Sequence, residues 1–325
     1  MKVGIVGAGM AGLSAARKLA TAGVSVKVFE KSHVLGGRVA TRKVGDYFFD
    51  TGATSISPRH LDLSAVMQKE LDTEELVKIQ KPIWAMEHGR VMPGDPARNA
   101  MERFVYRSGV NKLARLLAEN LDIQRECLVT EIGQDGQLNI QAEHFDWVIL
   151  TAPVTQTQSL LTNARDQRDL GQIGYRSCLS VLLGYKVPDP VVQYHALIDV
   201  EQRQPVVWVS LESVKSPGRA PEGHSAFVVQ MNSNYSKMRY EGAEDEVIHE
   251  ATNLLGRLYG AEYETPEIAQ VKKWKYSQSE LPMSFEEANR GDTKILVAGD
   301  GISGPRVELA FQSGIEAAER ILGSV

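Results

Sequence analysis

Three glycines near the start of the chain have the spacing of a phosphate-binding loop. Gly7, Gly9 and Gly12 form the pattern G-x-G-x-x-G, directly after an apolar run at residues 2–6 and at the start of a helical pattern at residues 10–22. In such a unit the first glycine permits a tight turn, the second lets backbone amides approach a pyrophosphate, and the third lets the helix pack on the strand. The positive end of the helix then faces the anion. We therefore expect a dinucleotide to bind here.

An acidic residue follows at the position expected for a ribose ligand. Glu30 ends a second apolar run, residues 24–29, and comes about 20 positions after Gly12, as in other dinucleotide-binding units. Its carboxylate would accept hydrogen bonds from a ribose diol and repel a 2′-phosphate, which disfavours NADP. The unit alone does not separate NAD from FAD, because both contain the ADP half that it binds.

Three further segments could bind the part of the dinucleotide beyond its adenosine. Residues 35–42 (LGGRVATR) supply two glycines and two arginines, and Arg38 can pair with a pyrophosphate. Residues 49–53 read F-D-T-G-A, and residues 298–310 read A-G-D-G-I-S-G-P-R-V-E-L-A. With the phosphate loop, these segments resemble the G-G-R-x-x-T-x-R, D-x-G-A and C-terminal flavin motifs of the FAD-dependent amine oxidase superfamily.

The resemblance implies non-covalently bound FAD and a set of contacts to it. In that superfamily the D-x-G-A element lies along the flavin, the aspartate matching Asp300 contacts the ribityl or phosphate region, and a valine matching Val129 meets the adenine. A helix starting near Val307 would direct its positive end at the pyrimidine side of the ring. The residues predicted to bind FAD are Gly7, Gly9, Met10, Ala11, Gly12, Glu30, Lys31, Gly37, Arg38, Arg42, Gly52, Ala53, Thr54, Val129, Gly299, Asp300, Arg306 and Val307.

Within the superfamily the chain resembles the renalase-like branch, especially its bacterial form. The length of 325 residues is short, residues 304–308 read G-P-R-V-E, and residues 270–278 read Q-V-K-K-W-K-Y-S-Q. This resemblance implies oxidation of 2- or 6-dihydro-NAD(P) to NAD(P)⁺, with dioxygen as acceptor and hydrogen peroxide as product. It also predicts a substrate pocket formed by Trp274, Tyr276 and Thr54.

The chain departs from its relatives at two places beside this pocket. Thr54 and Ser55 stand where many relatives have glutamine and an aromatic residue, and Lys272 and Lys273 stand where bacterial relatives often have His-Arg. An amine or unsaturated-ring oxidase of the same fold is therefore an alternative, in which Lys272 or Lys273 would be the lysine that amine oxidases commonly place near flavin N5. A flavin-binding protein that lacks this redox activity is a further alternative.

Composition and residue spacing argue against nucleic-acid-binding, metal-binding and membrane-spanning classes of protein. A net charge of −5 without a basic stripe argues against a nucleic-acid partner, and the seven histidines are scattered singly, which argues against a metal site. Cys127 and Cys178 lack the spacing of a metal or redox pair, so we expect free thiols. No apolar run approaches the roughly 20 residues of a membrane helix. Because the first strand begins almost at Met1, we expect a cytoplasmic protein, and we assign no catalytic residue.

The pattern of elements predicts an α/β fold: a Rossmann-type FAD-binding domain with an interleaved α+β substrate domain that carries an antiparallel sheet. The FAD-binding domain is expected at residues 1–53, 108–160 and 290–325, and the substrate domain at 54–107 and 161–289. Beyond the first βαβ unit, we expect helices at 110–120, 244–259 and 307–322, strands at 129–132, 147–150, 179–186, 206–211, 225–231 and 294–298, a turn at 135–136 and a loop at 216–223.

Overall fold

The apolar runs at the two ends of the chain form a five-stranded parallel sheet. The computed structural model describes all residues except 60, 88, 134–137, 172, 292 and 325. Strands buried on both faces need helices on both sides, so they contain few polar residues. The strand order is β18-β12-β1-β2-β9, in which β1 is Lys2–Val6, β2 Ser25–Phe29, β9 Asp122–Gln124, β12 Trp147–Leu150 and β18 Ile295–Val297.

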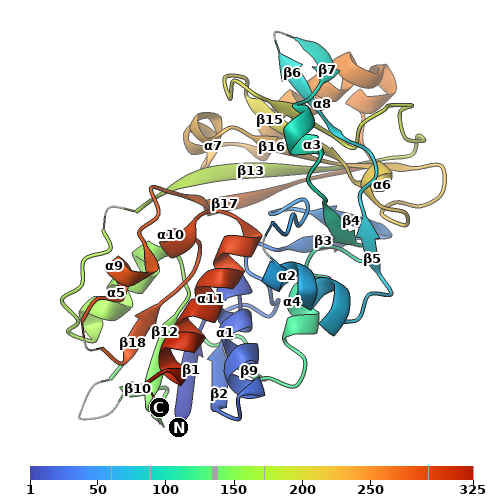
Figure 1. The fold of residues 1–325 in the computed structure, drawn as a ribbon. Coiled ribbons are helices and arrows are strands. Elements are labelled where there is room, and N and C mark those ends of the chain that lie inside the picture. Colours follow the sequence, from blue (N-terminus) through green and yellow to red (C-terminus); the bar gives the residue numbers. More distant parts are fainter. Residues whose placement is uncertain (60, 88, 134–137, 172, 292, 325) are drawn as a thin grey trace.

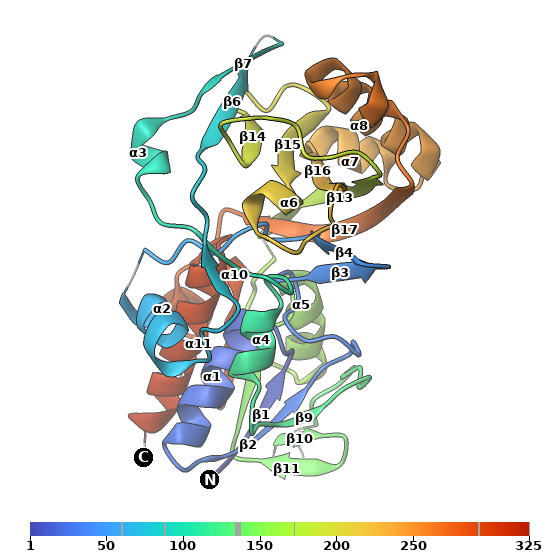
Figure 2. The ribbon, with the colours of Figure 1, turned by 90° about the vertical axis from the view of Figure 1, so that its right-hand side faces the viewer.

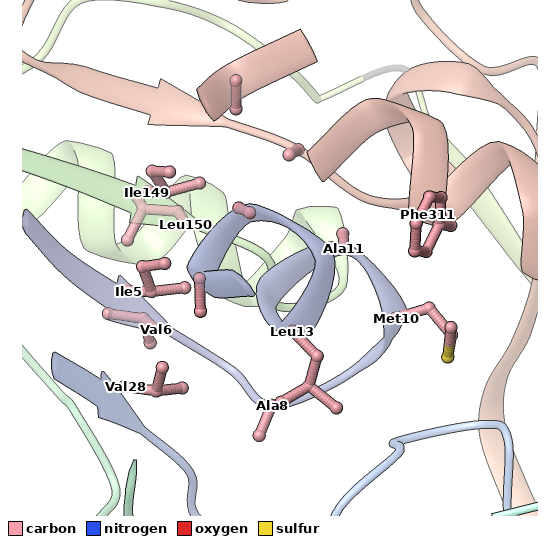
Figure 3. Packing of buried hydrophobic residues seen from close by; sticks show 14 of the residues in the cluster. Ile5, Val6, Ala8, Met10, Ala11, Leu13, Val28, Ile149, Leu150 and Phe311 are labelled. Carbon is pink, nitrogen blue, oxygen red and sulfur yellow. The ribbon is translucent and has the colours of Figure 1, made fainter. Parts of the chain in front are cut away.

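Two long helices from opposite ends of the chain lie side by side against this sheet (Figures 1 and 2). They are α1 (Met10–Thr21) and α11 (Val307–Leu322). A Cβ added to Gly314 would lie 2.0 Å from the backbone oxygen of Ala11, so only glycine allows this close approach. Ser14 Oγ donates to the carbonyl of Phe311 at 2.7 Å, and Figure 3 shows the Phe311 ring beside Ala11 and Met10. The C-terminal segment is thus fixed to the phosphate loop.

A second sheet of seven strands occupies the other half of the molecule. Most of its neighbouring strands are antiparallel, and β14 and β6 pair in parallel. Helix α8 (Glu244–Tyr259) packs against it, and β13 and β17 run along its border with the parallel-sheet half (Figure 1). The order is β17-β13-β16-β15-β14-β6-β7, with β6 at Ile83–Glu87, β7 Arg90–Pro93, β13 Gly174–Tyr185, β14 Ala196–Asp199, β15 Val206–Leu211, β16 Ser225–Met231 and β17 Ile268–Glu280.

Short elements complete the chain. The paired strands are β3 (Thr41–Val44) with β4 (Tyr47–Asp50), β5 (Leu76–Lys78) with β8 (Phe104–Tyr106), and β10 (Leu138–Ile140) with β11 (Glu143–Phe145). The helices are α2 (Leu61–Ala65), η1 (Val66–Glu70), α3 (Pro96–Asn99), α4 (Lys112–Leu117), α5 (Val154–Asn163), α6 (Glu212–Lys215), α7 (Ser233–Arg239), η2 (Ala261–Glu264), α9 (Phe285–Ala288) and α10 (Asp300–Ser303). No helix among the described residues is both long enough and apolar enough to cross a membrane.

The predicted fold class is confirmed, and one predicted strand is wrong. The segment Val129–Ile132 is irregular, although Val129 and Ile132 are buried, because it joins no ladder and follows Glu126 in the left-handed region at φ 54°. The edge strand of the parallel sheet is β9 instead. The helix predicted at 110–120 is the shorter α4, and the turn predicted at 135–136 lies outside the described residues.

The predicted domain boundaries stay a prediction, but the packing shows where each segment buries its side chains. Apolar residues between 56 and 106, such as Ile56, Leu63 and Phe104, pack in the core around the parallel sheet. Residues of β13, β15, β16 and α8 form a separate core in the second sheet. The segment at 54–107 therefore contributes to both halves, because β6 and β7 belong to the second sheet.

The buried His195 makes the stability of the fold depend on pH. Its side chain is 2% exposed, and Nδ1 lies 2.6 Å from the carbonyl oxygen of Lys81, to which it donates. Burial lowers the pKa of His195 to about 4. The unfolded chain therefore binds more protons below its ordinary pKa of about 6.5, and stability is lost as pH falls through this window. Between pH 7 and pH 5, we expect the free energy of unfolding to fall by about 2 kcal/mol through this residue.

The measurement is urea unfolding of wild type, His195→Asn and His144→Gln at both pH values. His195→Asn keeps a donor for Lys81 but cannot be protonated, so its stability should change less with pH. His144 is exposed, so His144→Gln should behave as wild type. Equal pH dependence in wild type and His195→Asn would show that His195 is not the group responsible.

Candidate cofactor and substrate site

The phosphate loop has the geometry that its glycines predict. Gly7 has a φ of 107°, a backbone angle that residues with a side chain rarely adopt. A Cβ added to Gly12 would lie 1.9 Å from the carbonyl oxygen of Gly7. An added Cβ at Gly9 meets no atom within 4 Å, so the loop is open on that side. Helix α1 begins there without a side-chain cap and without an acidic residue in its first turn. These features fit a pyrophosphate bound to the helix N-terminus.

Glu30 lies at the end of β2 and is bound to this loop. Its side chain is 8% exposed, Oε2 accepts from the backbone N–H of Ala8 at 2.7 Å, and Oε1 accepts from Ser32 at 2.8 Å. A carboxylate has about four lone-pair sites, so two amides leave capacity for a ribose diol. Glu30 thus fixes the loop in addition to the role predicted for it.

A second glycine turn packs on the first. Gly36 and Gly9 form an isolated parallel bridge, in which Gly36 N–H donates to the carbonyl of Ala8 at 2.8 Å. A Cβ added to Gly37 would lie 3.5 Å from the Cα of Gly9. This contact brings Arg38 close to the phosphate loop.

Arg38 and Asp300, two of the predicted FAD ligands, form a bidentate ion pair across the chain. Arg38 Nη1 and Nη2 each donate to a carboxylate oxygen of Asp300 at 2.6 Å. The guanidinium also lies 5.7 Å from the ring centroid of Tyr175, whose hydroxyl is 3.4 Å from Asp300 Oδ1. Burial, with the Asp300 charge adding to it, raises the pKa of Tyr175 to about 12. The pair holds the N-terminal and C-terminal flavin motifs together.

The beginning of α11 contains the predicted residues Arg306 and Val307. Arg306 is the N-cap of this helix and makes no side-chain cap, and its Nη1 is buried without a hydrogen-bond partner. A buried guanidinium nitrogen without a partner is costly, so this atom is suited to an anionic or polar group of a cofactor. Gly299, with a φ of 128°, precedes α10, and its N–H donates to Ser313 Oγ of α11 at 2.9 Å.

Other predicted residues lie at the edge of this arrangement or serve the core. Lys31 is exposed and its Nζ is 3.4 Å from Gln156 Oε1, and Arg42 is exposed on β3. Val129 is 8% exposed and packs in the core, as do Met10 and Ala11. Their contacts to FAD stay predictions.

The Thr51–Thr54 strip, which contains the predicted ligands Gly52, Ala53 and Thr54, is held by side chains of the second half of the molecule. The carbonyl of Thr51 accepts from Ser180 Oγ and from Trp274 Nε1, both at 2.8 Å. The carbonyl of Gly52 accepts from Gln230 Nε2 at 2.8 Å. These donors come from β13, β17 and β16, so the mixed sheet lies directly on the strip.

Trp274 and Tyr276 lie on β17, and the Trp274 indole contacts this strip. Both side chains are half-buried, and the ring of Tyr276 meets that of Tyr175 edge-on, with centroids 5.5 Å apart. Lys272 Nζ lies 4.9 Å from the centroid of the Trp274 ring, whereas Lys273 Nζ lies 3.7 Å from Glu244 of α8. Lys272 therefore lies on the same face of β17 as Trp274, and Lys273 lies on the opposite face.

A buried charge cluster next to the strip was not predicted. It consists of Asp50, Glu212, Lys215 and Arg219, whose side chains are 0% exposed. The sequence offered little signal, because Glu212 and Lys215 at i and i+3 normally form a surface pair. Tyr175, Ser180 and Gln230 were likewise missed, since single polar residues in apolar strands have no distinctive pattern.

Comparison with known proteins identifies the family. Residues 10–104 and 85–322 match the family described as flavin containing amine oxidoreductase, and the chain belongs to it. This family uses FAD, so the predicted cofactor and the class of FAD-dependent oxidoreductase are confirmed. The fit of the glycine loop, Glu30 and the unpartnered Arg306 nitrogen to a dinucleotide agrees with that cofactor.

Two curated relatives match this chain over short segments. The L-amino-acid oxidase of Crotalus adamanteus is 39% identical over 84 residues, which are 26% of this chain and 16% of that protein. The 4,4'-diapophytoene desaturase of Staphylococcus aureus (strain Newman) is 41% identical over 56 residues, 17% of this chain and 11% of that protein. The matched segments thus span a small part of these relatives.

Solved structures match over the whole chain at low identity. Reduced UDP-galactopyranose mutase has a TM-score of 0.80 at 14% identity and covers 100% of this chain and 96% of its own. Cyclohexylamine oxidase from Brevibacterium oxydans IH-35A has a TM-score of 0.77 at 14% identity and covers 99% of both chains. At this identity the likeness establishes the fold.

Removing a predicted FAD ligand should weaken cofactor binding. We expect Arg38→Ala and Glu30→Ala each to raise the FAD dissociation constant roughly 10- to 150-fold, because each loses a charge-assisted contact of about 1.5 to 3 kcal/mol. Glu30→Ala should also lower the melting temperature, since Ala8 and Ser32 lose their acceptor. Equilibrium dialysis of the apoprotein measures the affinity.

The control variant is Arg176→Ala. Arg176 lies on β13, pairs with Glu280 and has a side chain that is 51% exposed. The FAD affinity of this variant should equal that of wild type. Unchanged dissociation constants in both Arg38→Ala and Glu30→Ala would remove these residues from the cofactor site.

Proposed function

We propose that the protein is a FAD-dependent oxidase that takes a hydride from a small, flat substrate. The substrate class is a 2- or 6-dihydro-NAD(P), the product is NAD(P)⁺, and dioxygen is the acceptor and yields hydrogen peroxide. The observation that carries the proposal is the Trp274 indole, which is hydrogen-bonded to the Thr51–Thr54 strip at the place where the family resemblance puts the flavin. FAD is bound non-covalently in this proposal.

In this proposal the chain's own residues orient the donor ring. Hydride transfer requires the donor carbon at near-attack distance, and bound FAD supplies the electron acceptor. Trp274 is fixed by its N–H, and Tyr276 by its edge contact with Tyr175, so both can form rigid aromatic walls for a flat ring. Neither residue needs to move a proton.

A second candidate, an amine oxidase of the same fold, is favoured by one observation. Lys272 lies on the same face of β17 as Trp274, with its ammonium group on the face of the Trp274 ring. Amine oxidases commonly place a lysine near flavin N5, and the matched relative from Crotalus adamanteus is an L-amino-acid oxidase. In the first candidate, the same ammonium group would instead favour a substrate that carries phosphates and repel a protonated amine.

Anaerobic mixing separates these candidates. We expect 2- or 6-dihydro-NAD(P) to bleach the flavin absorbance in a stopped-flow measurement, and air to restore it with formation of hydrogen peroxide. Reduction by L-amino acids or primary amines, with a large loss of rate in Lys272→Met, would instead establish the second candidate. If no donor of either class reduces a fully loaded flavin, the protein binds FAD without this activity.

Trp274 should matter more for reduction than for folding. We expect Trp274→Ala to slow anaerobic flavin reduction by roughly 10- to 100-fold, because the donor loses a fixed wall and small misplacements are costly. Its free energy of unfolding should fall by less than the about 3 to 5 kcal/mol typical of a buried tryptophan. Thermal unfolding and stopped-flow reduction on the same preparation test this.

Trp147 of β12 is the matched control, because its side chain is 7% exposed and packs in the core. Trp147→Ala should lose about 3 to 5 kcal/mol of stability and keep a normal reduction rate in the folded fraction. A Trp274→Ala protein that behaves like Trp147→Ala would place Trp274 in the core and not in the pocket.

A further inference from the structure

The charge cluster at Asp50, Glu212, Lys215 and Arg219 joins three distant segments. Lys215 Nζ is 2.7 Å from both oxygens of Glu212 and 2.9 Å from Asp50 Oδ2. Arg219 Nη2 is 2.9 Å from the same Asp50 oxygen and donates to the carbonyl of Tyr106 at 2.7 Å. Two acids and two bases thus balance in charge within a fully buried space.

The cluster is held in its charged form. Burial alone would raise the pKa of Asp50, but Arg219 and Lys215 outweigh burial and hold this pKa well below its usual range. Burial alone would lower the pKa of Arg219, and Asp50 with Glu212 raises it instead. Apolar residues of similar volume often replace such buried pairs without loss of stability, so stability is a weak reason for this arrangement.

Hydrogen bonds from the cluster hold the Thr51–Thr54 strip at both ends. Before the strip, the N–H of Asp50 donates to Glu212 Oε2 at 3.1 Å, and Asp50 Oδ1 accepts from the N–H of Val110 at 3.0 Å. At its other end, Lys215 Nζ donates to the carbonyl of Thr54 at 2.9 Å. Lys215 is therefore the cation that links the two ends, through Asp50 and Thr54.

We propose that Lys215 is a positioning residue that fixes the Thr51–Thr54 strip against the cofactor and the aromatic pocket. The inference rests on the proposed function, in which this strip borders the flavin. Ser180, Trp274 and Gln230 hold the middle of the strip from the mixed sheet, and Lys215 holds its end next to the pocket residue Thr54. Because the side chain of Lys215 is fully buried, it acts through the strip and does not touch the substrate.

The test separates charge balance from the contact with Thr54. Lys215→Met leaves two acids facing one base and should destabilise the fold. The double variant Lys215→Met/Glu212→Gln restores the balance of one acid and one base but still lacks the donor to Thr54. Arg168→Met is the matched control, because Arg168 is also buried and ion-paired, with Asp166, away from the strip.

We expect the double variant to recover most of the melting temperature lost by Lys215→Met while its flavin properties stay altered. Its FAD dissociation constant should be roughly tenfold above wild type, its visible circular dichroism changed, and its anaerobic reduction rate at saturating donor lower by up to about 100-fold. Arg168→Met should lose melting temperature and keep all three flavin properties. Wild-type flavin properties in the double variant would overturn the proposal.

Two provisions keep this test decisive. If the double variant does not fold, Lys215→Gln/Glu212→Gln takes its place with the same readouts and the same criteria, because it keeps the charge balance and a polar group in the cluster but its shorter side chain does not reach the carbonyl of Thr54. FAD affinity and circular dichroism need no substrate, so they decide the role of Lys215 even if no dihydronicotinamide reduces the wild type. Failure of every dihydronicotinamide to reduce the wild type would contradict the proposed function and leave the role of Lys215 to be decided by these two measurements.

Discussion

The hydrogen bonds from the mixed sheet to the carbonyls of the Thr51–Thr54 strip join the two halves of this molecule. Ser180, Gln230 and Trp274 each donate to a carbonyl of a segment that leaves the hairpin β3–β4. A loop carbonyl buried at such a border must find a donor, since an unpaired one costs about 1 to 3 kcal/mol. These hydrogen bonds fix the position of the mixed sheet relative to the strip.

A second constraint, the close packing of α1 and α11, holds the C-terminal segment of the chain against the N-terminal one. The contact between Gly314 and Ala11 lets the helices approach until Ser14 reaches the carbonyl of Phe311. This packing places Asp300 opposite Arg38, so motifs from the two ends of the chain form one site. The open side at Gly9 and the unpartnered nitrogen of Arg306 belong to the same half of the molecule.

The parts of this structure that were predictable share a physical reason. Glycine spacing after an apolar run reflects steric needs that few other residues meet, so the loop at Gly7–Gly12 and the position of Glu30 followed from the sequence. Periodic apolar patterns placed α8 and α11 to the residue. In contrast, Val129 and Ile132 are buried without a ladder, which an apolar pattern does not distinguish from a strand.

The charge cluster was unpredictable because burial of Lys215 and Arg219 is decided by partners far along the chain. Which face of β17 meets the Thr51–Thr54 strip likewise depends on strand pairing that the local sequence does not specify. The most direct test of the central claim is a crystal structure of the protein with FAD. We predict the pyrophosphate at the Gly7–Gly12 loop and Arg38, and the flavin ring along the Thr51–Thr54 strip with Trp274 beside it. A flavin ring placed away from this strip, with Trp274 outside its pocket, would contradict that claim.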